Sequence, residues 1–359
     1  MQWVKEPRVL SVQSHVVHGN VGNKAATFPM QLHGVEVDPL NVVHFSNHTG
    51  YKVFKGTRMS AEEFSSIVDG LTTNGFLPTY SCVLSGYVGN EAVLKELAKL
   101  VGKWQDERRK ALAEYGGFED PSRPVYVCDP VCGDNGKLYV SESVLPVYRD
   151  QLIPLADIVT PNGFEASVLS GIEVKDIASA KKAAQWFHDR GVSRVVIKSF
   201  DDVASHPDGK TISLITSEIA ATTGESSTPS VHRIEIAKLA TTLSGTGDAF
   251  AALVIGHLTS LYAAKKPTPT TVEVASAADG RSLFVQAVER AVASIHGILS
   301  RTMSMLEVSA EKGSPLTVVK PESAPNSAHG GKPVQELAIV KNASMVLDPP
   351  MEGFTAAQV

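Results

Sequence analysis

The sequence contains few cysteines, few aromatic residues and little net charge. Its three cysteines are Cys82, Cys128 and Cys132, and the last two lie in "VCDPVC", which lacks the two-residue spacing of a zinc or redox pair. We therefore expect reduced, partly buried thiols in a cytoplasmic protein. The 38 acidic and 33 basic residues give a formal charge of −5, which disfavours a nucleic-acid-binding surface.

Long apolar runs are also missing. No stretch approaches the length of 18 apolar residues, and the N-terminal "MQWVKEPRVLSVQ" lacks the apolar core of a signal peptide, so we expect neither a membrane span nor export. Hydrophobic residues nevertheless make up 43% of the 359 residues, enough for a sizeable core. A chain of this length fits one large α/β domain or two ordinary ones.

Short β-rich runs alternate with helical patterns along the chain. Strands are predicted at 8–13, 34–45, 80–87, 124–130, 156–160 and 193–199, and helices at 20–34, 60–71, 90–104, 162–171, 178–191, 248–262 and 282–312. This alternation predicts a central, mostly parallel sheet with helices on both faces, a three-layer α/β/α fold. In such sheets ligands bind at the carboxyl ends of the strands.

Three segments are predicted to lie at the periphery of a single domain spanning 1–359. Residues 105–123 are charged and glycine-rich and are interpreted as a helix extension and loop, and 264–281 are rich in proline, threonine and alanine. Both segments are interpreted as surface insertions. Residues 320–333 are interpreted as a flexible connector before a late strand-like segment, "VQELAIV".

The segment "LSGTGDAFAALVIGHL" at 243–258 places two glycines and one aspartate before a helical apolar run. One interpretation is structural, since glycines suit a tight turn and Asp248 can cap a helix. The other is chemical: bare N–H groups at a helix start bind anions, and a neighbouring carboxylate can take a proton from an alcohol during phosphoryl transfer. The segment alone leaves both open.

Polar residues follow four other predicted strands. Ser14 lies in "SVQSHVVHGNVGNKAA", and Thr49 lies in "VVHFSNHTGY". Asp129 closes the strand in "CDPVCGDNGKLYVSE", and "VTPNGFEASVLSG" opens a helix in which Glu165 either completes a capping box or faces inward toward a cation. Their joint position at one sheet edge matches what phosphoryl transfer needs: an acceptor pocket, a base, and donors with a metal for the phosphates.

These motifs together resemble a known family. The segments "VLSVQSHVVHGNVGNKAATFP", "FSNHTGY", "YVCDPVCGDNGKLYV", "PLADIVTPNGFEASVLSG" and "SGTGDAF" are similar, in this order, to pyridoxal kinases of the ribokinase-like superfamily, over about residues 8–262. The resemblance implies a ribokinase-like fold, ATP-dependent phosphorylation of the 5′-hydroxymethyl group of pyridoxal, pyridoxine or pyridoxamine, Mg²⁺ (or another divalent cation), a monovalent cation (K⁺ or Na⁺), and a homodimer.

The resemblance also implies roles for individual residues. Asp248 corresponds to the catalytic base, and Gly245, Thr246 and Gly247 correspond to the anion hole. The implied lining of the vitamin site is Ser14, Val21, Phe45, Thr49 and Tyr87. The implied cation region is Asp129, Thr160 and Glu165, and a flap near 131–141 carries Asp134 and Tyr139. The other implied nucleotide contacts are Asn162, Ser199 and Thr246 at the phosphates and Leu239 and Leu243 at the adenine.

The sequence departs from the family at Lys198, where some relatives carry a hydroxyl residue next to Ser199. A lysine there puts the local cation contacts in doubt, and it can itself contact a phosphate. Two alternatives to a pyridoxal kinase remain: a related kinase for hydroxymethylpyrimidine or a sugar, and a protein that binds pyridoxal phosphate without catalysis. An intact Asp248 between the expected glycines and helix disfavours the second.

Overall fold

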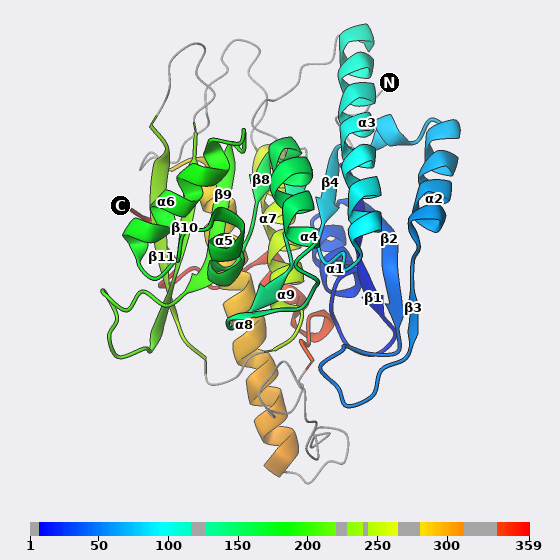
Figure 1. Ribbon diagram of the computed structural model, residues 1–359. Helices are drawn as coiled ribbons and strands as arrows, with labels where there is room; N and C mark the ends of the chain where they lie inside the picture. The colour runs from blue at the N-terminus through cyan, green and yellow to red at the C-terminus, as the bar shows by residue number, and fades with distance from the viewer. Residues whose placement is uncertain (1–6, 116–125, 220–227, 240–242, 265–280, 312–335) are drawn as a thin grey trace.

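One ten-stranded sheet organises the chain. The computed structural model describes residues 7–115, 126–219, 228–239, 243–264, 281–311 and 336–359 (Figure 1). The strands follow the order β12-β11-β10-β9-β8-β5-β4-β1-β2-β3 across the sheet. Their bounds are β1 Arg8–Val16, β2 Glu36–Phe45, β3 Gly56–Arg58, β4 Cys82–Ser85, β5 Tyr126–Cys128, β8 Ile158–Val159, β9 Arg194–Phe200, β10 Thr211–Glu218, β11 Ser230–Ala237 and β12 Ala357–Gln358.

The centre of the sheet is parallel and its edges are antiparallel. The six strands from β9 to β2 pair in parallel, with Val9 of β1 lying between Val37 of β2 and Cys82 of β4. This confirms the mostly parallel sheet expected from the sequence. The edge strands β3, β10, β11 and β12 run antiparallel to their neighbours and were not predicted.

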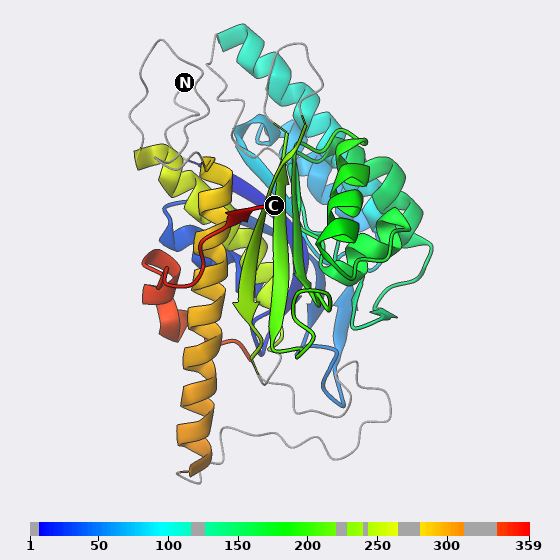
Figure 2. The ribbon, with the colours of Figure 1, turned by 90° about the vertical axis from the view of Figure 1, so that its left-hand side faces the viewer.

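Helices cover both faces of the sheet, as predicted. Figures 1 and 2 show α2 to α6 on one face and α1, α7, α8 and α9 on the other, and each set packs in its own hydrophobic cluster. The helix bounds are α1 Asn23–Leu32, α2 Ala61–Thr73, α3 Glu91–Tyr115, α4 Val144–Val147, α5 Gly163–Ser170, α6 Ile177–His188, α7 Thr246–Ala264, α8 Leu283–Glu311 and α9 Ala343–Leu347. Short 3₁₀ and π turns lie at Leu77–Thr79, Tyr148–Leu152, Ile153–Leu155 and Val340–Asn342.

Local sequence explains where two of these helices begin. The Ser60 hydroxyl accepts the Glu63 N–H at 3.2 Å, and the Glu63 carboxylate accepts the Ser60 N–H at 2.8 Å. The same reciprocal capping box joins Asn162 and Glu165 at the start of α5. The capping interpretation of Glu165 is therefore confirmed, and the same side chain is 2% exposed and faces inward. The capping box fixes α5 directly after the end of β8.

Helix α7 is the central element behind the sheet. By length and composition alone it is the one helix among the described residues that is apolar enough to cross a membrane. Its residues from Ala249 to Leu258 are all buried, and it packs against α1 and α8. An apolar surface all round is what a fully enclosed core helix requires, so this burial accounts for its composition.

The predicted peripheral segments are only partly described. Helix α3 continues to Tyr115, so the first half of 105–123 extends that helix. The rest of that segment, almost all of 264–281 and all of 320–333 lie outside the described residues. The strand-like interpretation of "VQELAIV" is wrong: Glu336 forms a single parallel bridge with Ser244, and the chain then turns through a 3₁₀ turn into α9.

Candidate active site

The carboxyl ends of the parallel strands and the first turn of α7 meet at one edge of the sheet, the lower edge in Figure 1. Asp129 follows β5, Thr160 follows β8, and Lys198 lies near the end of β9. Ser14 lies near the end of β1, at the point where the pairing register with β2 shifts. Loops far apart in sequence thus deliver polar side chains to the edge where this type of fold binds ligands.

Asp248 lies in the first turn of α7 and faces the loop after β1. Its Oδ2 accepts a hydrogen bond from the Gly22 N–H at 2.7 Å. Gly22 packs closely against Ser14: a Cβ added at Gly22 would lie 2.1 Å from the Ser14 carbonyl oxygen. Burial raises the pKa of Asp248 to about 6, although the Gly22 N–H opposes that rise. This places a carboxylate with a near-neutral pKa beside Ser14.

The turn before Asp248 is held tightly against the loop after β1. Gly245 has a φ of +85°, and a Cβ there would lie 1.9 Å from the Asn20 carbonyl oxygen. Because α7 begins at Thr246, the N–H groups of its first turn have no partners within the helix. A Cβ at Gly247 would lie 3.4 Å from Lys198 Nζ and 3.9 Å from Asp129 Oδ2. The turn therefore presents anion-binding N–H groups next to a lysine ammonium.

Asp129 and Lys198 form a buried ion pair. Lys198 Nζ lies 2.7 Å from Asp129 Oδ1, and the two side chains are 12% and 1% exposed. Burial raises the pKa of Asp129, and the Lys198 charge opposes that rise. Burial alone would lower the pKa of Lys198, but the carboxylates of Asp129 and Glu165 raise it above its usual value. The lysine is consequently held in its charged form.

Glu165 is buried beside this pair, but its oxygens are engaged by the backbone. Oε1 accepts the Cys132 N–H at 3.0 Å, and Oε2 accepts the Asn162 N–H at 2.8 Å. Burial raises the pKa of Glu165 to about 8, with the Lys198 charge acting in the opposite direction. Asn162 also donates from Nδ2 to the Gly133 carbonyl at 2.8 Å, so it ties α5 to the segment after β5.

Two oxygens of the predicted cation region are buried and have no hydrogen-bond donor or acceptor among the described residues: Asp129 Oδ2 and Thr160 Oγ1. No group of three or more acidic, histidine or cysteine side chains able to hold a metal occurs in the described part of the chain. One carboxylate oxygen and one hydroxyl suit Mg²⁺ that arrives with nucleotide, because that ion takes most of its ligands from phosphates and water.

The residues implied to line the vitamin site divide into two kinds. Val21 and Phe45 are buried and form an apolar cluster with Val16 and Val43. Tyr87 is half-buried, while Thr49 is exposed in the loop that follows β2. The structure thus provides an apolar wall and separate polar groups along the ends of β1, β2 and β4.

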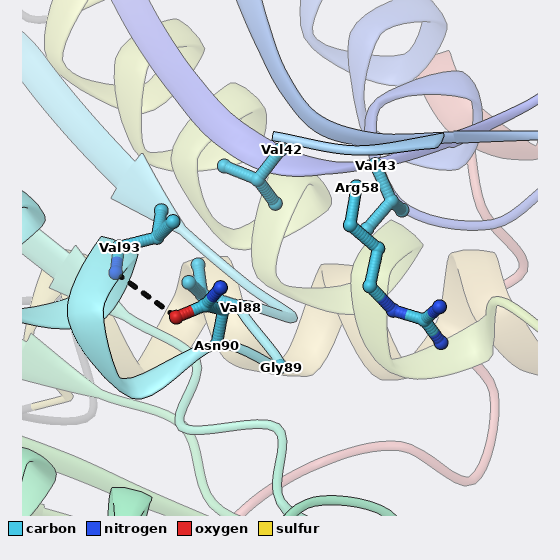
Figure 3. A pocket seen from close by; sticks show the side chains of 7 residues that line it. All are labelled: Val42, Val43, Arg58, Val88, Gly89, Asn90 and Val93. Carbon is cyan, nitrogen blue, oxygen red and sulfur yellow. Dashed lines mark hydrogen bonds between the residues drawn. The ribbon is translucent and has the colours of Figure 1, made fainter. Parts of the chain in front are cut away.

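A small recess shares Val43 with this wall (Figure 3). It is lined by Val42, Val43, Arg58, Val88, Gly89, Asn90 and Val93. Asn90 Oδ1 accepts the Ala92 and Val93 N–H groups at the start of α3, so it caps that helix. None of the predicted catalytic residues lines the recess, which leaves the edge around Asp248 as the candidate active site.

The predicted flap is a short hairpin. Strands β6 Gly133–Asp134 and β7 Lys137–Leu138 pair antiparallel, and Asn135 and Gly136 form the turn with φ of 51° and 75°. The Asp134 carboxylate accepts the Asn135 N–H at 2.8 Å, which shapes this turn. Tyr139 follows the hairpin and is 40% exposed. Both side chains therefore lie on or beside a projecting two-stranded element.

The remaining predicted nucleotide contacts lie around the same edge. Ser199 has a φ of +36°, a backbone conformation that is uncommon for a residue with a side chain and often marks functional sites. Leu239 is half-buried just after β11, and Leu243 is buried in the core cluster behind the sheet. Their contacts with nucleotide stay predictions.

Sequence reasoning missed Glu336. Its carboxylate accepts the Asn20 N–H at 2.9 Å and the Tyr51 hydroxyl at 3.0 Å. It thereby joins the loop after β1, the loop that carries Thr49 and the segment paired with Ser244. No local pattern signals this role, because the partners lie 316 and 285 residues away in sequence.

Comparisons with known proteins agree with this geometry. Residues 105–300 match the phosphomethylpyrimidine kinase family. The chain is 35% identical to pyridoxal kinase of Bos taurus over 324 residues, covering 89% of this chain and 91% of that protein. The chain belongs to the pyridoxal kinase family. It is therefore a kinase of the ribokinase-like fold, which confirms the resemblance seen in the sequence.

Solved structures of the family are similar over nearly the whole chain. Pyridoxal kinase from Leishmania donovani, in complex with ADP and ginkgotoxin, has a TM-score of 0.76 and 34% identity, covering 98% of this chain and 99% of that one. The same enzyme with ADP and pyridoxine has a TM-score of 0.75. Pyridoxal kinase from Trypanosoma brucei has a TM-score of 0.70 and 31% identity, covering 99% of each chain.

Proposed function

We propose that this protein transfers the γ-phosphoryl group of ATP to the 5′-hydroxymethyl group of pyridoxal, pyridoxine or pyridoxamine. The observation that carries the proposal is the position of Asp248, whose carboxylate faces the loop after β1 and lies in the first turn of α7. Pyridoxal kinase from Leishmania donovani, a relative of 34% identity, has been solved in complex with ADP and pyridoxine and with ADP and pyridoxamine, which supports this substrate class.

In the proposed mechanism Asp248 accepts the hydroxyl proton of the vitamin. The N–H groups of the turn at Gly245, Thr246 and Gly247 stabilise charge on the transferred phosphoryl group. Asp129 and Thr160 would hold Mg²⁺ with the nucleotide phosphates, and that ion would supply further positive charge to the phosphoryl oxygens. The hairpin with Asp134 and Tyr139 closes over the site and excludes water, which limits hydrolysis of ATP.

The other predicted contacts belong to the vitamin-binding site and the nucleotide-binding site. Ser14, Thr49 and Tyr87 bind the polar groups of the vitamin, and Val21 and Phe45 support its ring. The phosphates are contacted by Asn162, Lys198, Ser199 and Thr246. The adenine is bordered by Leu239 and Leu243. Glu165 acts by anchoring the backbone of Cys132 and Asn162. We further propose a single-domain, cytoplasmic homodimer.

The test is phosphorylation of competing alcohols. Purified protein with ATP and Mg²⁺ is expected to form pyridoxal 5′-phosphate, followed by its absorbance, faster than it phosphorylates hydroxymethylpyrimidine or ribose. Hydroxymethylpyrimidine is the main alternative substrate, because the matching family is described as phosphomethylpyrimidine kinase. A higher kcat/KM for that alcohol would replace the proposed substrate, and pyridoxal binding without ATP turnover would indicate a non-catalytic protein.

The pKa of Asp248 predicts the acid limb of the pH profile. Burial raises this pKa to about 6 in the protein without ligands, and only the ionised carboxylate can accept a proton, so kcat/KM should fall as pH decreases through about 6. The measurement is kcat/KM from pH 5 to 8 with pyridoxal and with pyridoxine, whose own ionisations differ. An inflection that stays in place for both vitamers belongs to the free enzyme, whereas a kcat/KM that is constant down to pH 5 would contradict Asp248 as the base.

A further inference from the structure

Lys198 is a buried cation at the place where this family was expected to use a monovalent metal ion. Its backbone is fixed by a hydrogen bond from its N–H to the Pro161 carbonyl at 2.7 Å and by a bridge to Asn162. Its side chain reaches Asp129 Oδ1 at 2.7 Å and is 12% exposed. The ammonium is thus held in position from both ends.

The surrounding charges need such a cation. Asp129 and Glu165 are buried and Asp248 is half-buried, and each of these carboxylates interacts electrostatically with the Lys198 ammonium. Lys198 is the one cation for which an ion pair with any of these three carboxylates is found in the described part of the chain. Buried carboxylates without a nearby positive charge are strongly destabilising. Lys198 therefore supplies the positive charge that this cluster requires.

The oxygens left over do not suit a second monovalent ion. Asp129 Oδ1 is taken by the ammonium, and both oxygens of Glu165 accept backbone N–H groups. Asp129 Oδ2 and Thr160 Oγ1 remain, which suits one divalent ion carried by the phosphates. A dedicated K⁺ or Na⁺ site would need several more oxygens than these residues provide, so the expected monovalent cation does not fit here.

We infer that the ammonium of Lys198 replaces the monovalent metal ion in this active site, so that phosphoryl transfer requires neither K⁺ nor Na⁺. The inference rests on the proposed function for its kinetic consequence. An ammonium is a compact unit charge with three N–H donors, and Asp129 uses one of them. Gly247 lies close to the same nitrogen, so a remaining N–H can face the phosphoryl group at the anion hole without giving up Asp129.

The test compares cations at constant ionic strength. The wild-type protein, with Mg²⁺ and ATP as its tetramethylammonium salt, is assayed in KCl, NaCl or tetramethylammonium chloride. We expect its kcat and its melting temperature to be independent of the monovalent cation. A large loss of either in tetramethylammonium would overturn the inference, because that ion is too large to enter a metal site.

The Lys198→Thr variant, which lacks the ammonium, is expected to depend on a monovalent metal ion. In tetramethylammonium its kcat should fall by about 10²–10³-fold, the usual effect of removing one preorganised electrostatic group. K⁺ or Na⁺ should restore part of the kcat and raise the melting temperature, because Asp129 then lacks its ammonium. The exposed Lys175→Thr is the matched control and should show no cation dependence.

Three results distinguish the possible failures. If Lys198→Thr raises the KM for ATP and no monovalent cation restores it, Lys198 is a phosphate contact only and the inference is wrong. If no alcohol is phosphorylated under any condition, the proposed function fails, while the melting temperatures in the three salts still decide the role of Lys198. If Lys198→Thr does not fold, the wild-type comparison alone confirms or overturns the cation independence.

Discussion

Replacing Asp248 by asparagine is expected to reduce kcat by about 10²–10⁴-fold, the usual contribution of a positioned general base. The fold should persist, because an asparagine oxygen can still accept the Gly22 N–H that Asp248 Oδ2 accepts at 2.7 Å. Burial raises the pKa of Asp248 and so disfavours its charge. A neutral side chain of the same shape should therefore leave the melting temperature equal or higher.

The measurement combines kcat for pyridoxal with a thermal melt. Asp69→Asn, an exposed change on α2, is the matched control and should leave both unchanged. Loss of turnover together with an unaltered KM for pyridoxal would identify a chemical role, since binding would be intact. Normal turnover by Asp248→Asn would mean that another group takes the proton.

The predictable part of this fold comes from local patterns. The parallel centre was predicted because each buried strand is followed by a helix with visible start signals, as at Ser60 and Asn162. The edge strand β10 was missed because residues 201–210, which join it to β9, contain no helix, and this breaks that alternation. Strand β10 also buries hydroxyl residues, and the Ser217 hydroxyl lies 2.7 Å from Nε2 of His188, which is 29 residues away in sequence. Sequence alone does not reveal such a partner.

The candidate site was predictable in its position more than in its contacts. Polar residues after parallel strands had to meet at one edge, and the structure places Ser14 beside the Gly22–Asp248 contact. The sequence could not show that Asp129 pairs with Lys198, or that Glu336 joins the loops on the substrate side. These contacts depend on side-chain directions and on separations of 69 to 316 residues, which no local pattern encodes.

Replacing Gly245 by alanine is expected to produce the second large effect. Its φ of +85° costs a residue with a side chain roughly 1–2 kcal/mol, and its Cβ would lie 1.9 Å from the Asn20 carbonyl oxygen. Backbone cannot yield as a flexible side chain can, so the turn and the 20–22 loop must separate. That movement also pulls Gly22 from Asp248, and a displacement of about 1 Å can cost about 10²-fold in kcat.

The Gly34→Ala variant separates the cost of the left-handed φ from the cost of the steric clash with Asn20. Gly34 also has a left-handed φ, +75°, but a Cβ there meets nothing within 4 Å, so this variant carries the backbone strain alone. Urea unfolding should show that both variants lose stability, with the larger loss in Gly245→Ala, while only Gly245→Ala loses kcat. If Gly245→Ala keeps its kcat, the contact between the turn and Asn20 does not hold Asp248 in place. The base would then have to be positioned by α7 itself, which is buried from Ala249 to Leu258.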